Sequence, residues 1–187
     1  MRILAILCLA LALSQFGSAA WLQMKAALAQ QLIAAAWGAP GTKKPWRWAD
    51  TYPVAKLVFS AQQQTLYVLA GRQGHALAFG PGHDGSSSPP NAPGITVIAG
   101  HRDTHFSVLQ NLAVGDELSL TGKDQVTQRY RVETLEVADS QRRPLRLAGD
   151  GLALITCFPF DALSAGGPLR YVVVARPIHS ASAKHRA

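Results

Sequence analysis

Short β-like segments separated by turn-forming residues fill the chain from about residue 50 onward, and this pattern limits the possible folds more than any other feature. The segments are rich in aliphatic and β-branched residues and are bounded by Gly, Pro, Asn, Asp or Ser. The eight candidate strands are 56–60, 65–70, 75–79, 95–100, 117–120, 128–137, 152–157 and 169–176. Helical periodicity is scarce there, with one short candidate at 105–112. We therefore predict an all-β fold, and a closed or nearly closed barrel, because closure removes exposed strand edges.

Chain length and charge narrow the functional classes. A chain of 187 residues is long enough for one domain with an N-terminal appendage. The formal net charge is +7, but the Lys and Arg residues are scattered and no nucleic-acid-reading motif is present. We therefore expect no nucleic-acid partner. A basic domain held near an anionic membrane surface explains the charge more simply.

The N-terminus is predicted to be a membrane anchor. The stretch from Ile3 to Ala20 has no charged residue, and roughly 18 helical residues span about 27 Å, enough for a thin hydrocarbon core. A cleaved signal peptide is the alternative, since Ser18 and Ala20 are small enough for a peptidase site. The anchor is favoured because apolar and aromatic residues continue from Trp21 to Trp37, as in an interfacial helix. Both readings predict that the rest of the chain is exported.

These features predict four regions. Residues 1–22 form the anchor or signal peptide, residues 23–50 a membrane-proximal helix and a linker, residues 51–178 the barrel, and residues 179–187 a flexible tail. Within the barrel, the connections at 80–94 and 158–168 are long and rich in breakers. These two loops are candidates for the walls of a groove.

Cys157 is the first candidate for chemistry. It ends the apolar run that starts at Gly151, and the other cysteine, Cys8, lies in the predicted anchor, so no structural disulfide is expected. A lone thiol in an exported domain is either a nucleophile or a small inert residue of the core. Residue type and position leave both readings open.

His101 and Arg170 complete a candidate catalytic set. Nucleophilic cysteine chemistry needs a thiolate, a proton donor or acceptor, and a group that stabilises negative charge on the attacked carbonyl oxygen. His101 follows the apolar segment 95–100, and Gly100 before it would allow a close approach by another backbone or a substrate. Arg170 opens the segment 169–176 and could present a rigid fork of donors.

Taken together, the motifs resemble those of the sortase family. The order is Ala99-Gly-His-Arg-Asp-Thr-His-Phe106, then Leu112-Ala-Val-Gly-Asp-Glu117, then Leu154-Ile-Thr-Cys-Phe-Pro-Phe160, and finally Leu169-Arg-Tyr-Val-Val173. The similarity extends from about Tyr52 to Pro177 and implies an eight-stranded sortase-type β-barrel with short helices, preceded by the N-terminal membrane-anchoring helix. The short catalytic domain, the N-terminal arrangement and Ala165-Gly-Gly-Pro168 further resemble class GN sortases of Gram-negative bacteria.

The resemblance assigns roles to residues. Cys157 would be the nucleophile, His101 the general acid and base, and Arg170 the residue that binds either the sorting-signal backbone or the oxyanion. Thr156 would line the substrate groove. The family pattern Thr-Leu-x-Thr-Cys begins here with Ala153, so the departure is remote from the thiol.

The resemblance also implies partners and a location. The substrate would be a protein with a C-terminal sorting signal, in the class GN setting an exported protein with von Willebrand A-like character, and an amine would accept the acyl group. The chain would sit in the inner membrane through a single N-terminal span, with the catalytic domain in the periplasm. No cofactor is expected, and no metal, because an acidic cluster like the calcium sites of some sortases is absent from the sequence.

Several alternatives remain at this stage. Asp103 and His105 could orient His101, although Asp103 is expected to cap the following helix. His83 is expected to be solvent-exposed, and a metal site involving His83, His101, His105 and Cys157 has no tight ligand spacing to support it. Rival functions are another thiol acyl-transferase or hydrolase, such as an L,D-transpeptidase, whose Ser-His-Gly-Cys motif is missing, and a non-catalytic tethered β-barrel.

Overall fold

The computed structural model describes residues 24, 27–72, 74–142, 148–162 and 166–178. The predicted anchor (1–22) and the predicted tail (179–187) lie outside the described residues. Among the residues that are described, no helix combines the length and apolar character needed to cross a bilayer.

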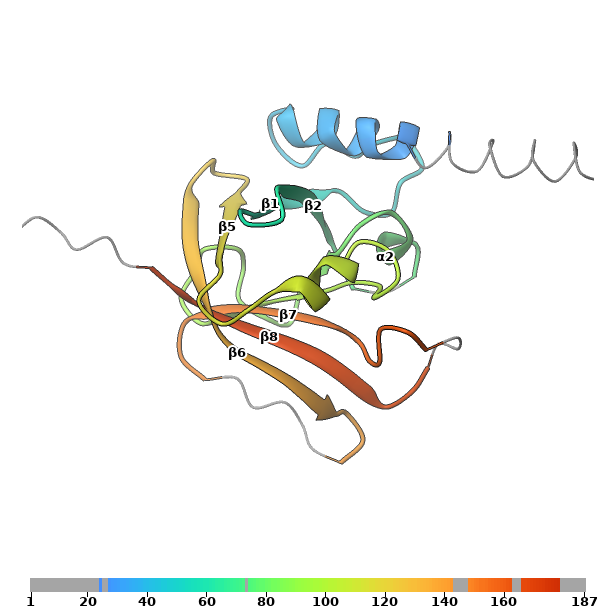
Figure 1. Ribbon diagram of the computed structural model, residues 1–187. Helices are drawn as coiled ribbons and strands as arrows, with labels where there is room; N and C mark the ends of the chain where they lie inside the picture. The colour runs from blue at the N-terminus through green and yellow to red at the C-terminus, as the bar shows by residue number, and fades with distance from the viewer. Residues whose placement is uncertain (1–23, 25–26, 73, 143–147, 163–165, 179–187) are drawn as a thin grey trace, which may run out of the picture.

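Eight strands in the described residues form a closed barrel, which confirms the predicted architecture (Figure 1). The strands are β1 (Pro53–Phe59), β2 (Gln64–Ala70), β3 (Gly82–His83), β4 (Ile95–Ala99), β5 (Glu117–Gly122), β6 (Thr127–Asp139), β7 (Gly151–Cys157) and β8 (Leu169–Pro177). Their order around the barrel is β1-β2-β3-β4-β7-β8-β6-β5. Two neighbouring pairs, β2 with β3 and β4 with β7, are parallel, and the other pairs are antiparallel.

The barrel interior is an aliphatic and aromatic core. In β1 the buried residues alternate with half-buried ones, as expected for a strand with one face on the core. Ala55, Leu57 and Phe59 point inward and meet Leu120 of β5 and Leu154 of β7 in one cluster. Burial of this cluster is the main driving force for closure of the barrel.

Two strand predictions were wrong in opposite ways. Residues 75–79, predicted as a strand, form the short helix α2 (His75–Phe79), and strand β3 lies in the segment 80–94 that was predicted to be irregular. The sequence His-Ala-Leu-Ala-Phe contains good helix formers, so a run this short does not distinguish helix from strand. Strand β3 is defined by its pairing with β2 and β4, which the local sequence does not show. The backbone comes so close there that a Cβ at Gly82 would lie 2.0 Å from the carbonyl O of Gly71.

The predicted short helix at 105–112 is present as a 3₁₀ helix, η1 (Ser107–Asn111). Phe106 occupies its N-cap, and no side chain caps it. The capping role expected for Asp103 is therefore wrong. Phe106, fully buried in the core, begins this helix instead.

A helix over residues 27–38 packs on the outside of the barrel, over β2 and α2 (Figure 1). Ile33 forms a small apolar cluster with Leu69 and Ala76. The ammonium group of Lys123, which follows β5, donates to the carbonyl oxygens at the C-terminal end of the helix, those of Ala36, Trp37 and Ala39, at 3.0–3.3 Å. A cation at this end also complements the helix dipole. The helix 27–38, which was predicted to lie near the membrane, is thus docked on the barrel and does not project away from it.

Replacing Leu120 by Ala tests the core. Leu120 is fully buried, so Leu120→Ala is expected to lower the free energy of unfolding by about 3 to 5 kcal/mol. Val126→Ala, at an exposed position after β5, is the matched control and should cost less than about 0.5 kcal/mol. Urea unfolding followed by circular dichroism measures both. Equal effects of the two changes would contradict the assignment of Leu120 to the core.

Candidate active site

The pairing of β7 with β8 brings the cysteine and the arginine together. The two strands are antiparallel, and Cys157 at the end of β7 is the register partner of Arg170 at the start of β8. Directly opposite residues in such a pair have Cα atoms about 4.5 to 5.5 Å apart. Two residues predicted from separate motifs therefore lie at the same end of the barrel.

His101 reaches the same end through the parallel pair β4 and β7. The backbone N–H of Gly100 continues this ladder by donating to the carbonyl O of Ile155 at 3.1 Å, and the hydroxyl of Thr156 donates to the carbonyl O of Gly100 at 2.7 Å. Parallel strands end at the same edge of a sheet, so His101, directly after Gly100, emerges beside the end of β7. The ends of β4 and β7 and the start of β8 thus form one rim.

The Gly100 position is explained by an aromatic ring. A Cβ at Gly100 would lie 2.8 Å from the ring of Phe106, which is fully buried. The backbone N–H of Phe106 donates to the carbonyl O of His101 at 2.9 Å and closes the turn between them. Another backbone or a substrate was expected to come close to Gly100, whereas the structure places the Phe106 side chain there, and the anchored turn leaves His101 exposed.

Neither proposed reactive residue is sealed in the core. Cys157 is a free, half-buried cysteine, and His101 is exposed. A structural histidine of the interior or an inert core thiol would be fully covered by neighbouring atoms. The structure thus removes the simplest non-catalytic explanation for His101 and weakens it for Cys157.

Arg170 is held by carbonyl groups next to the thiol. Its Nη1 donates to the carbonyl oxygens of Gly167 at 2.6 Å and Leu169 at 2.8 Å. An arginine has five N–H donors, and these two bonds use one terminal nitrogen. Among the described residues these are its hydrogen-bond partners, so Nε and Nη2 face no competing acceptor there.

Arg102 is a feature of the site that the sequence analysis missed. Its side chain is largely buried, and Nη2 donates to the carbonyl O of Ala162 at 2.6 Å. This bond ties the segment after β4, which carries His101, to the loop between Cys157 and Arg170. Nothing in the local sequence distinguishes Arg102 from an exposed arginine of a polar loop, because its partner lies 60 residues away.

The aromatic rings of Phe158, Phe160 and Tyr171 pack together where the chain leaves Cys157. Phe158 stacks on Tyr171 with ring centroids 6.2 Å apart, and Phe160 meets Tyr171 edge-on at 5.2 Å. Burial raises the pKa of Tyr171 above its usual value, so its phenol stays neutral. Phe160 and Tyr171 also pack against the barrel core, so these rings fix the start of the β7–β8 loop on the barrel.

The remaining candidates have other surroundings. His105 is half-buried, and burial, with a smaller contribution from the charge of nearby His101, lowers its pKa. Thr156 is 2% exposed and its hydroxyl is bonded to Gly100, so it links β7 to β4, and its expected contact with substrate stays a prediction. His83 was expected to be solvent-exposed, which is wrong: it is half-buried, and its Nε2 donates to the carbonyl O of Ser88 at 3.0 Å.

A metal site finds no support in the described part of the chain. There, no three His, Cys, Asp or Glu side chains gather in a way that could hold an ion. The expectation of a metal-free site remains a prediction.

The chain is similar in sequence to proteins of a known family. The family model for the sortase domain matches residues 58–178. Sortase D of Bacillus subtilis (strain 168) is 28% identical over 115 residues, which are 60% of this chain and 58% of that relative, so the chain spans little more than half of its length.

Solved structures agree in fold. Sortase C-1 from Actinomyces oris is 25% identical with a TM-score of 0.58, covering 68% of this chain and 75% of that one. A lid mutant of sortase A from Corynebacterium diphtheriae has a TM-score of 0.61 at 21% identity, covering 86% and 95%. Streptococcus agalactiae sortase C1, in a complex with MTSET, has a TM-score of 0.60 at 21% identity, covering 82% and 86%. The family match covers more than half of the chain and includes the whole rim formed by β4, β7 and β8, and the chain therefore belongs to the sortase family.

Proposed function

We propose that the protein is a membrane-anchored cysteine transpeptidase that cleaves a C-terminal sorting signal of a partner protein and transfers the acyl part to an amine. The observation that carries the proposal is the shared rim: β7 and β8 pair Cys157 with Arg170, and β4 runs parallel to β7 and ends just before His101. Membership of the sortase family, whose members are generally cysteine transpeptidases, supports it.

In the first half-reaction, the Cys157 thiol gives its proton to His101, and the resulting thiolate attacks the carbonyl carbon of a Thr-Gly-like bond in the sorting signal. A tetrahedral intermediate forms with negative charge on the carbonyl oxygen. The bond to nitrogen then breaks, and His101 gives a proton to the leaving amine. The products are a thioester on Cys157 and the released C-terminal fragment.

In the second half-reaction, an incoming amine attacks the thioester carbon. His101, now neutral, takes the proton from that amine as a base. Collapse of the second tetrahedral intermediate forms the new amide bond and returns the sulfur to its starting state. Water in place of the amine gives hydrolysis by the same route.

Arg170 is proposed to bind negative charge or a backbone carbonyl beside the thiol. Its Nη1 bonds to Gly167 and Leu169 fix the side chain, while Nε and Nη2 have no hydrogen-bond partner among the described residues and can donate to a substrate. The bond from Arg102 to Ala162 supports this arrangement by holding the loop that joins the two strands. A fixed arginine stabilises a developing charge better than a mobile one because it needs no reorganisation.

The finer assignments rest on the sequence. The uncharged stretch from Ile3 to Ala20 supports a single N-terminal span. With the resemblance to class GN sortases, we infer an inner-membrane protein with a periplasmic catalytic domain. The same resemblance suggests an exported partner with von Willebrand A-like character.

Replacing Cys157 by Ala is the direct test of the nucleophile. Cys157→Ala should reduce release of the C-terminal fragment by at least about a thousandfold, because no other group supplies the attacking sulfur. The assay uses the full chain in detergent, hydroxylamine as amine, and a pool of peptides that vary around a Thr-Gly bond. Cys8→Ala, which changes the other cysteine, should retain full activity. Equal cleavage by the native chain and Cys157→Ala would disprove the role.

Replacing Arg170 by Lys tests the forked donor. A lysine keeps the charge but loses the planar pair of donors, and removal of one oxyanion donor typically costs about a hundredfold in kcat. A fall in kcat would assign Arg170 to the oxyanion, whereas a rise in KM with unchanged kcat would assign it to the peptide backbone. Arg131→Lys, at an exposed β6 position paired with Glu117, should change neither constant. Unaltered kinetics in Arg170→Lys would contradict both roles.

His101 and His105 can be separated by activity and by pH. His101→Ala should abolish turnover, while His105→Gln should leave kcat within about threefold, because the proposal gives His105 no proton to transfer.

His105 has a lowered pKa in the folded protein, so the unfolded chain takes up its proton first as the pH falls through about 6.5. Folding stability is therefore lost on acidification, and His105→Gln should show a smaller decrease in Tm between pH 7.5 and 5.5. An unchanged pH dependence would contradict this effect.

A further inference from the structure

Exposed apolar side chains gather on one face of the molecule, away from the barrel core. Four of the seven large hydrophobic residues exposed in the described part of the chain are Met24, Leu28, Leu32 and Trp48, with exposed fractions from 36% to 84%. Leu28 and Leu32 are four residues apart on one side of the helix 27–38, and Met24 lies four residues before Leu28 in the sequence. We call these four residues, with the exposed basic residues Lys43, Lys44 and Arg47 that precede Trp48 in the sequence, the Trp48 face.

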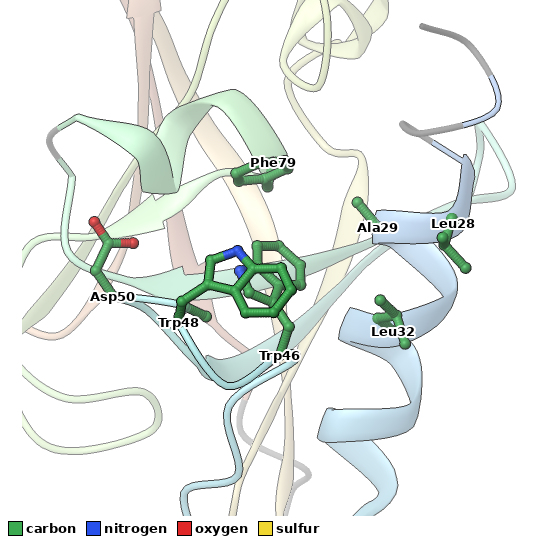
Figure 2. A pocket seen from close by; sticks show the side chains of 8 residues that line it. Leu28, Ala29, Leu32, Trp46, Trp48, Asp50 and Phe79 are labelled. Carbon is green, nitrogen blue, oxygen red and sulfur yellow. The ribbon is translucent and has the colours of Figure 1, made fainter. Parts of the chain in front are cut away.

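The Trp48 face contains an apolar groove. Figure 2 shows Leu28 and Leu32 on the helix across from Trp46 and Trp48, and these residues help to line one cavity of about 420 Å³. Trp46 is held in place by an edge-on contact with Phe79, with ring centroids 5.0 Å apart. Apolar surface gathered in this way marks an interaction site more often than scattered exposed residues do.

The helix is fixed on the barrel, so the Trp48 face has a fixed orientation. Its opposite side is buried through Ile33 and Trp37. The side-chain amide of Gln30 donates to the carbonyl O of Phe79 at 2.6 Å, and Lys123 holds the C-terminal end of the helix and lies over the Trp37 ring at 5.1 Å. Whatever covers the Trp48 face therefore also orients the barrel.

Charge indicates an anionic partner. Lys43, Lys44 and Arg47 are exposed, and the first 50 residues contain five Lys or Arg and a single acidic residue, Asp50. Tryptophan side by side with basic residues is the composition favoured at the interface of an anionic bilayer, where the ring lies among the headgroups.

The chain sequence points to the same partner. The helix that carries Leu28 and Leu32 follows the uncharged apolar stretch from Ile3 to Ala20 in the sequence, after residues 21–26. We propose that the Trp48 face docks on the surface of an anionic lipid bilayer, so that β2 and α2 face the membrane. This contact is separate from a membrane span and from catalysis, and it sets the orientation of the barrel against the bilayer.

Quenching of Trp48 by brominated lipid tests the contact in the full chain. The protein is reconstituted in phosphatidylcholine vesicles with about 30% phosphatidylglycerol, with ordinary or brominated acyl chains. The fluorescence lost on Trp48→Phe isolates the Trp48 signal from the other tryptophans. We expect bromination to reduce the Trp48 signal by about half or more. The signal isolated in the same way with Trp37→Phe, a buried residue, should be unaffected.

The charge contribution is tested in the same vesicles. Each basic residue near an anionic surface contributes about fivefold to partitioning, so the triple variant Lys43→Gln, Lys44→Gln, Arg47→Gln should lower Trp48 quenching to its level in vesicles of phosphatidylcholine alone. Arg129→Gln, an exposed change on β6, is the single-charge control and should have no effect.

The proposal is overturned if Trp48 is not quenched in anionic vesicles, or is quenched equally without anionic lipid. Concentration-dependent protection of Trp48 from iodide in detergent, without lipid quenching, would instead assign the face to a second copy of the chain. None of these readouts depends on peptidase activity.

Discussion

The parallel pairing of β4 with β7 is the constraint on which the candidate site depends. Two parallel strands necessarily end at the same edge, so whatever follows β4 lies beside whatever ends β7. Thr156 is the residue before Cys157, and Gly100 is the residue before His101. The hydroxyl of Thr156 donates to the carbonyl O of Gly100 and so strengthens this junction. Antiparallel β8 then starts at the same edge and brings Arg170 opposite the thiol. Three short segments, distant in sequence, thereby share one rim.

Buried groups behind the rim determine which side chains stay accessible. Phe106 fills the core and occupies the space over Gly100, which turns the chain so that His101 is exposed. Arg102, next in sequence, goes the other way and holds the β7–β8 loop through Ala162. A buried guanidinium group is costly unless its donors are satisfied, so this bond also restricts the positions that the loop can adopt. Adjacent residues of one motif thus have opposite surroundings, His101 exposed at the rim and Arg102 buried behind it.

The N-terminal helix packs on the outside of the barrel, over β2 and α2. Lys123 and the Ile33 cluster attach the helix to the outside of the barrel and give it a fixed orientation relative to β2 and α2. A proposed membrane contact at the Trp48 face would therefore set the direction from which a membrane-associated peptide reaches Cys157. Attachment through a flexible linker alone would leave that direction undetermined.

Alternating apolar segments are local signals, so most strands and the barrel could be predicted from the sequence. The ordered motifs are local signals as well, and they identified Cys157, His101 and Arg170 as candidates. The sequence assigned 75–79 to a strand and missed β3, since a five-residue run fits either helix or strand and the two-residue strand β3 is defined only by its pairing with β2 and β4. Tertiary structure alone decided that Arg102 supports the loop, that Thr156 is turned inward, and that His83 is bound to Ser88. Hydrogen bonds and burial between distant segments leave no periodicity in the sequence, so only the folded chain reveals them.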